Sequence, residues 1–126
     1  AVLDTLVTSG GVSGVHHGNK NQFATASTDT DDLWNNDRIN TISIVTRHDA
    51  HAQQVVDALK SGKNVFVEKP LALTLDELNM IDKAYQKANN SNTVRLMVGF
   101  NRRYAPHVIK MKELLDSHRS PKSIIM

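Results

Sequence analysis

The stretch TISIVTRHDAHAQQVVDALKSGKNVFV, residues 41–67, carries the clearest pattern of secondary structure in the chain. It begins with a β-branched run at residues 41–46 and ends with a second short apolar run at residues 64–67. Four apolar residues between the two runs recur at the i, i+3, i+4 and i+7 spacing of one helix face: Ala52, Val55, Val56 and Leu59. Gly62 follows as a C-terminal stop signal. The pattern therefore predicts a strand, a helix and a second strand parallel to the first.

The same alternation continues on both sides of this unit. Further strands are predicted at residues 3–8, 24–28 and 94–100, and residues 123–126 read as the start of a sixth. Helices are predicted at residues 74–88, behind a Thr-x-x-Glu capping box, at residues 106–115, behind a first-turn proline, and in a short segment at residues 31–35. Residues 15–22 have poor helix propensity. We expect an α/β fold with a doubly wound, mostly parallel sheet, in which ligands bind beyond the carboxyl ends of the strands.

The bulk composition excludes several classes of protein. The 126 residues suit one domain, with 40% hydrophobic and 22% charged residues. A net charge of +2 gives no argument for binding nucleic acid or a membrane surface. The chain has no cysteine, which excludes disulfides and thiolate metal sites, and no apolar run long enough to span a bilayer. We expect a cytoplasmic protein without membrane or nucleic-acid partners.

The residues directly after each predicted strand are the candidate site residues. They are Ser9-Gly10, Asp29, Arg47-His48, Glu68-Lys69-Pro70 and Asn101-Arg102-Arg103. Lys69 follows a buried strand, and the proline after it favours an extended backbone at the lysine. A cation held there can donate a hydrogen bond to a substrate hydroxyl or carbonyl. From the residues alone, a surface lysine at the end of a strand is an equal alternative.

Three motifs together resemble one enzyme family. They are Thr46-Arg47-His48-Asp49-Ala50-His51, Glu68-Lys69-Pro70 and Gly99-Phe100-Asn101-Arg102-Arg103-Tyr104. Over nearly the whole chain, and most strongly from residue 41 onward, the sequence resembles the Rossmann domain of Gfo/Idh/MocA oxidoreductases. Within this family, the motifs are most similar to those of bi-domain oxidoreductases. In those proteins, the half that this chain resembles follows a half that is like a zinc alcohol dehydrogenase. The chain departs from the family at Arg47, where proline is usual.

The resemblance implies a role for each matching residue. The implied cofactor-binding residues are Ser9, Gly10, Thr46, Arg47, His51, Glu68, Lys69 and Pro70, with Lys69 also catalytic and with Asn101 and Arg102 on the substrate side. Arg47 either meets a cofactor phosphate or lies in solvent. His51 is implied to lie near the nicotinamide ribose, against the alternative of an early-helix histidine without a ligand. For Arg103, a salt bridge is as good an interpretation as a ligand contact.

The resemblance also implies an oxidoreductase that transfers hydride between NAD or NADP and a secondary alcohol of a sugar or cyclitol. It places residues 1–121 in a Rossmann domain that lacks its first strand, its Gly-x-Gly-x-x-Gly turn and most of its first helix. Residues 122–126 would begin a second domain, where the family carries its histidine acid/base. We therefore expect this chain to be a fragment that is inactive alone and binds no cofactor by itself, although its parent is an enzyme.

The glycine-rich stretch SGGVSG, residues 9–14, imitates the missing pyrophosphate loop. The family resemblance instead implies that Ser9 and Gly10 lie where the adenosine ribose of the cofactor binds. Ser9 has no charge to repel a 2′-phosphate, so both NAD and NADP are permitted. A glycine-rich turn without a ligand is an equally good interpretation.

A missing first strand would leave a gap within the sheet. We expect the sheet to close, so that residues 3–8 pair with residues 41–46 in the flavodoxin-like order 2-1-3-4-5. The alternative is a homodimer in which a second copy fills the gap.

The residues also bear on two other functions. A receiver-type module is disfavoured because Ser9-Gly10 and Arg47 stand where it needs acidic residues, whereas a non-catalytic binding module on the same scaffold stays open. No set of histidines and carboxylates has metal-ligand spacing.

Overall fold

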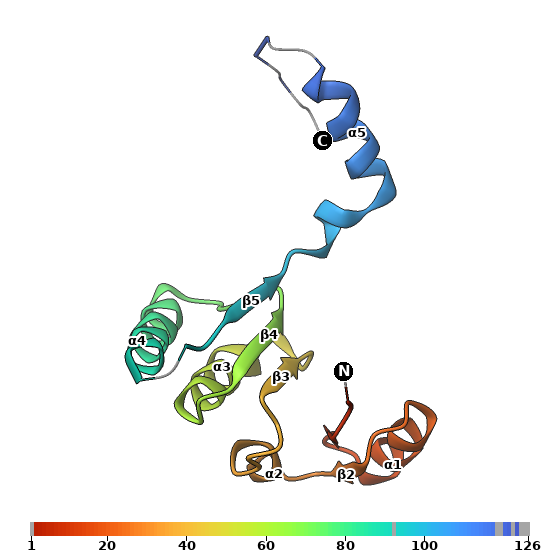
Figure 1. Cartoon of the computed structure of the whole chain (residues 1–126), viewed down its shortest axis with the longest axis vertical. Helices are drawn as coiled ribbons and strands as arrows, with labels where there is room; N and C mark the ends of the chain where they lie inside the picture. Colours follow the sequence, from red (N-terminus) through yellow and green to blue (C-terminus); the bar gives the residue numbers. More distant parts are fainter. Residues whose placement is uncertain (1, 92, 118–119, 122, 124–126) are drawn as a thin grey trace.

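The computed structural model describes residues 2–91, 93–117, 120, 121 and 123. Strands and helices alternate along this part of the chain (Figure 1). The strands are β1 Thr5–Val7, β2 Thr25–Ser27, β3 Thr41–Ile44, β4 Asn64–Glu68 and β5 Leu96–Gly99. The helices are α1 Gly11–Lys20, α2 Asp31–Trp34, α3 His51–Lys60, α4 Leu75–Ser91 and α5 Pro106–Asp116, with 3-10 turns η1 His48–Ala50 and η2 Asn101–Tyr104. The predicted α/β class is confirmed.

The strands form two separate parallel sheets, β1-β2 and β3-β4-β5. The strand β3 is hydrogen bonded to β4 and not to β1. The predicted closure to the order 2-1-3-4-5 is therefore wrong. Both strands at the opening are short, at 3 residues for β1 and 4 for β3. Their free backbone groups can bond to water, which lowers the cost of leaving the sheet open.

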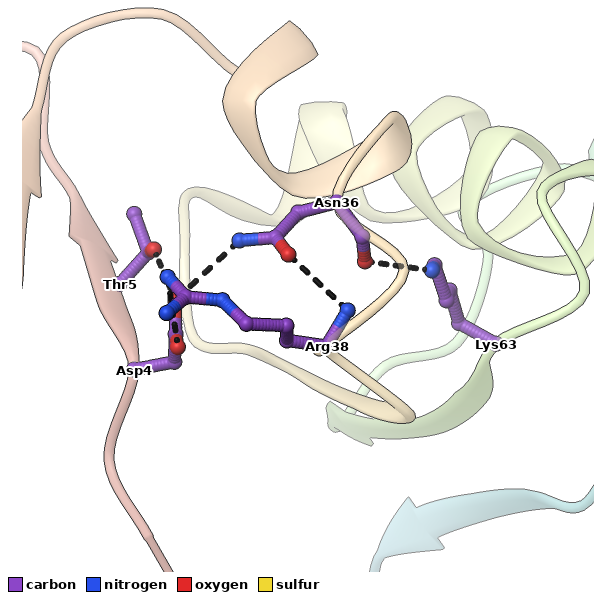
Figure 2. A network of polar contacts seen from close by, with 5 residues as sticks. All are labelled: Asp4, Thr5, Asn36, Arg38 and Lys63. Carbon is purple, nitrogen blue, oxygen red and sulfur yellow. Dashed lines mark hydrogen bonds and ion pairs between the residues drawn. The ribbon is translucent and has the colours of Figure 1, made fainter.

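A polar network connects the segment between the two sheets to both of them (Figure 2). Asp4, just before β1, accepts a hydrogen bond of 3.2 Å from the side-chain amide of Asn36 and forms an ion pair of 3.3 Å with Arg38. On the other side, the buried Lys63 donates a 2.8 Å hydrogen bond to the backbone carbonyl of Asn36. The loop after α2 is thus tied to the start of β1 and to the start of β4.

The hydrophobic core belongs to the three-stranded sheet. Helices α3 and α4 lie along one face of this sheet (Figure 1). Alternate strand residues point into that core, as the burial pattern of β3 shows, with Ile42 and Ile44 buried and Thr41 and Ser43 exposed. The four residues of α3 predicted from the helical spacing, Ala52, Val55, Val56 and Leu59, are all buried, and His51 and Ala58 are buried beside them. Helix α5 extends away from both sheets (Figure 1).

The local sequence signals form as predicted. Gly62 has a positive φ of 72° after α3, a conformation that glycine adopts without strain. At the start of α4, Thr74 and Glu77 exchange hydrogen bonds of 3.1 and 3.2 Å, as in a capping box. Pro106 occupies the first turn of α5. These short-range signals depend on few residues, which is why the sequence alone predicts them.

Helix α1 forms despite the poor propensity predicted for residues 15–22. Its buried residues are Gly14 and Gly18, which face the small sheet. A Cβ atom at Gly14 would lie 2.5 Å from the hydroxyl oxygen of Thr8, and one at Gly18 would lie 3.4 Å from the Cβ of Ala26. Close packing of helix backbone on the sheet therefore outweighs the weak intrinsic preference of the glycines.

Two predictions concern the end of the chain. The predicted sixth strand and the boundary at residue 122 involve residues 122 and 124–126, which lie outside the described residues. Among the residues that the structure describes, no helix is long and apolar enough to cross a membrane.

Candidate functional site

The candidate site lies at the carboxyl edge of the sheet β3-β4-β5. All three strands are parallel, so the turns that follow them leave the sheet at the same edge. The three turns contain Thr46 and Arg47 after β3, Lys69 and Pro70 after β4, and Asn101 after β5. This is the edge at which open α/β sheets bind their ligands.

A hydrogen bond joins the turns after β4 and β5. The side-chain amide of Asn101 donates to Glu68 Oε1 at 2.8 Å. The register of the sheet places Glu68 directly opposite Gly99. A Cβ atom at Gly99 would lie 2.9 Å from Phe66 Cζ and 3.3 Å from Glu68 Oε2. Gly99 therefore leaves the room that the Glu68 carboxylate occupies, and Asn101 holds that carboxylate in place.

A buried histidine joins the turns after β3 and β4. His51, the first residue of α3, is 0% exposed. Its Nδ1 lies 2.7 Å from the carbonyl oxygen of Pro70, and its Nε2 lies 3.1 Å from the carbonyl oxygen of Thr46. The hydroxyl of Thr46 in turn donates to the side-chain oxygen of Gln54 at 2.6 Å. The polar groups of the three turns are therefore fixed by contacts to the sheet and to α3.

Cationic side chains surround this edge and are exposed to solvent. Arg47 forms an ion pair of 3.6 Å with Asp49, and its side chain is 90% exposed. Lys69 and the η2 residues Arg102 and Arg103 are also exposed. Ion pairs between exposed groups contribute little to stability. A ligand that binds Arg47 would therefore displace only a weak ion pair, and Lys69, Arg102 and Arg103 form no ion pair within the described part of the chain.

Ser9 and Gly10 belong to the other sheet, at the end of β1. Both are exposed, and the carbonyl oxygen of Gly10 accepts bonds of 2.9 Å from the hydroxyls of Thr8 and Ser13. A hollow of about 310 Å³ lies beside this turn, between α1 and β2. It is lined by Gly11, Val15, Ala26, Ser27 and Thr28. The structure therefore does not join Ser9 and Gly10 to the other predicted residues by any contact.

The structure brings most of the predicted site residues together and adds two that sequence reasoning missed. His51 contacts the carbonyl oxygens of Thr46 and Pro70, and a separate hydrogen bond joins Asn101 to Glu68. The two additions are Gln54, and Gly99, which stands first in the third sequence motif but has no predicted role there. Gln54 lies three residues after His51 on the same helix, so helical spacing could have identified it. The close approach at Gly99 depends on the neighbouring strand and has no local signal.

The groups at this edge suit a ligand that carries phosphates and hydroxyls. Exposed ammonium and guanidinium groups suit phosphate and hydroxyl oxygens, and a carboxylate and an amide suit ribose hydroxyls. The absence of a side chain at Gly99 keeps Glu68 in place at this edge. Among the described residues, no group of three or more histidine or acidic side chains could hold a metal ion.

The chain is similar to several known proteins. The sequence profile of the Gfo/Idh/MocA oxidoreductase family, NAD-binding Rossmann fold, matches residues 11–100. Oxidoreductase P35 of Formosa agariphila is 37% identical over 100 residues, which are 79% of this chain and 30% of that protein. Inositol 2-dehydrogenase/D-chiro-inositol 3-dehydrogenase of Lactiplantibacillus plantarum is 35% identical over 104 residues, 82% of this chain and 29% of that protein.

A solved structure has a similar fold over most of this chain. The crystal structure of myo-inositol 2-dehydrogenase from Lactobacillus plantarum matches with a TM-score of 0.81 and 26% identity. The match covers 91% of this chain and 33% of that one. The chain thus spans about 30% of the curated relatives that it matches.

Proposed function

This chain belongs to the Gfo/Idh/MocA oxidoreductases, and on that basis we propose that it forms the NAD(P)-binding part of a dehydrogenase for a secondary alcohol of a sugar or cyclitol. The observation that carries the proposal is the meeting of three strand-end turns at one sheet edge, joined through His51 and through the Glu68–Asn101 bond. The inositol dehydrogenase among its relatives supports the substrate class.

Each group at the edge has a role in the proposal. A bound nicotinamide cofactor supplies the hydride chemistry. The ammonium of Lys69 donates a hydrogen bond to the oxygen of the reacting alcohol or ketone and so stabilises negative charge on it. Glu68 lies beside Lys69 in the cofactor site, and Asn101 fixes its carboxylate at 2.8 Å. Arg102 contributes to the substrate side, and Arg47 meets a phosphate.

The residues at the end of β1 determine which cofactors the proposal allows. Ser9 is exposed and carries no charge, and the Gly10 carbonyl is already bonded to two hydroxyls. A carboxylate there would repel the 2′-phosphate of NADP and hydrogen-bond the 2′-hydroxyl of NAD. With a serine, the proposal admits both cofactors.

The test is a titration of NADH and NADPH against this chain and against a longer polypeptide. The longer one carries residues 1–126 in place of the matching segment of the L. plantarum dehydrogenase. We expect cofactor binding and inositol oxidation in the longer polypeptide, and no turnover by the chain alone. Loss of turnover in Lys69→Met, with cofactor affinity kept, supports the assigned role of the lysine. A folded longer polypeptide that binds neither cofactor would refute the proposal and favour a non-catalytic binding module.

A further inference from the structure

The environment of His51 differs from that of a residue that binds a ligand directly. Its side chain is 0% exposed, and it begins α3 beneath the turns after β3 and β4. Both ring nitrogens already face backbone carbonyl oxygens, at 2.7 Å for Pro70 and 3.1 Å for Thr46. A ligand could reach either nitrogen only after one of these contacts had opened.

The chemistry of the ring indicates which of its two nitrogens donates a hydrogen bond. A carbonyl oxygen only accepts hydrogen bonds, and a neutral imidazole has one N–H to donate. The shorter distance is that from Nδ1 to Pro70, so a neutral ring donates there. A doubly protonated ring donates to Thr46 as well. In either state the bond to the turn after β4 is kept.

This bond controls the position of the proposed catalytic group. Pro70 directly follows Lys69, so fixing the Pro70 carbonyl fixes the backbone from which the lysine side chain starts. The contact to Thr46 fixes the neighbouring turn, where Thr46 also bonds to Gln54. One side chain therefore sets the relative position of two turns of the site.

We propose that His51 is a positioning residue that acts through the Pro70 carbonyl to place Lys69, and that it does not touch the dinucleotide. This replaces the contact with the nicotinamide ribose that the family resemblance implies. The importance of Lys69 rests on the proposed function, whereas the hydrogen bond from His51 to Pro70 does not. The two can therefore fail separately.

Two substitutions at position 51 separate the two ring nitrogens. In His51→Asn the side-chain amide nitrogen takes the place of Nδ1, which faces Pro70. In His51→Gln the amide nitrogen takes the place of Nε2, which faces Thr46. The control is His48→Asn, because His48 is an exposed histidine whose ring centroid lies 5.6 Å from that of His51.

The readout is the NMR spectrum of the isotopically labelled 126-residue chain without ligand. We expect His51→Asn and His48→Asn to keep the wild-type signals of the Lys69 amide and the Pro70 carbonyl carbon. We expect His51→Gln to shift both. A role in space-filling alone would affect Asn and Gln alike, and that result would overturn the proposal.

The wild-type chain gives a measurement that does not depend on the variants folding. We expect the Nδ1 proton of His51 to be visible and to exchange slowly with water, because the ring is buried against Pro70. An unprotonated Nδ1 would overturn the proposal. Failure of the longer polypeptide to bind NADH or NADPH would refute the proposed function and leave this result unchanged.

Discussion

Replacing Gly99 by alanine tests how the edge of the sheet is built. The new methyl carbon would lie 2.9 Å from Phe66 Cζ, closer than real Cβ contacts, and 3.3 Å from Glu68 Oε2. Overpacking of this kind costs about 1–3 kcal/mol. Alanine in a strand recovers roughly 0.5–1 kcal/mol relative to glycine. The balance is a destabilisation of about 1 kcal/mol, or a fall in Tm of about 3–6 °C for a chain of this size.

The assay is thermal and urea unfolding of Gly99→Ala, with the Asn101 side-chain amide followed by NMR. We expect the amide signal to move, because the displaced carboxylate of Glu68 loses its bond to Asn101. Phe66→Leu removes the ring atom that the methyl would meet. The double variant should therefore be more stable than the sum of the single effects predicts, by about 0.5–1 kcal/mol. Strict additivity, or wild-type stability in Gly99→Ala, would show that the Phe66 ring does not crowd position 99.

Three further predictions concern the rest of the fold. Gly14→Ala should be less stable than Gly18→Ala by about 1–2 kcal/mol. The reason is that the new methyl at position 14 would lie 2.5 Å from a threonine hydroxyl, whereas the methyl at position 18 would make an ordinary contact at 3.4 Å. Equal unfolding midpoints of the two variants would contradict this prediction. Lys63→Met keeps the buried stem but removes its 2.8 Å bond to the loop after α2, and should lower the unfolding free energy by about 1–2 kcal/mol in urea titrations. Because β3 is an open edge, the Ser43 amide should exchange with deuterium faster than the Val65 amide, which bonds to the chain before β5; slow exchange at Ser43 would show that this edge is paired.

The alternation of strands and helices could be predicted because each element carries its own pattern. The core face of α3 follows from helical spacing, and the end of α3 follows from Gly62. The parallel arrangement then brings the residues after β3, β4 and β5 to one edge. Most of the candidate site could thus be predicted from which residue follows which strand.

Two features that the sequence did not predict depend on contacts between distant residues. The expected pairing of β1 with β3 ignored the loop that Asp4, Arg38 and Lys63 hold between the two sheets. The burial of His51 depends on the carbonyl of Pro70, 19 positions along the chain. No local pattern of residue types records either distance.

The proposed function requires that the turns after β3, β4 and β5 form the nicotinamide side of a dinucleotide site. An amide NMR titration of NADH into the longer polypeptide that carries this chain tests this requirement. We expect the signals of Thr46, Lys69 and Asn101 to shift together as NADH is added. Saturable NADH binding that leaves all three signals in place would contradict it.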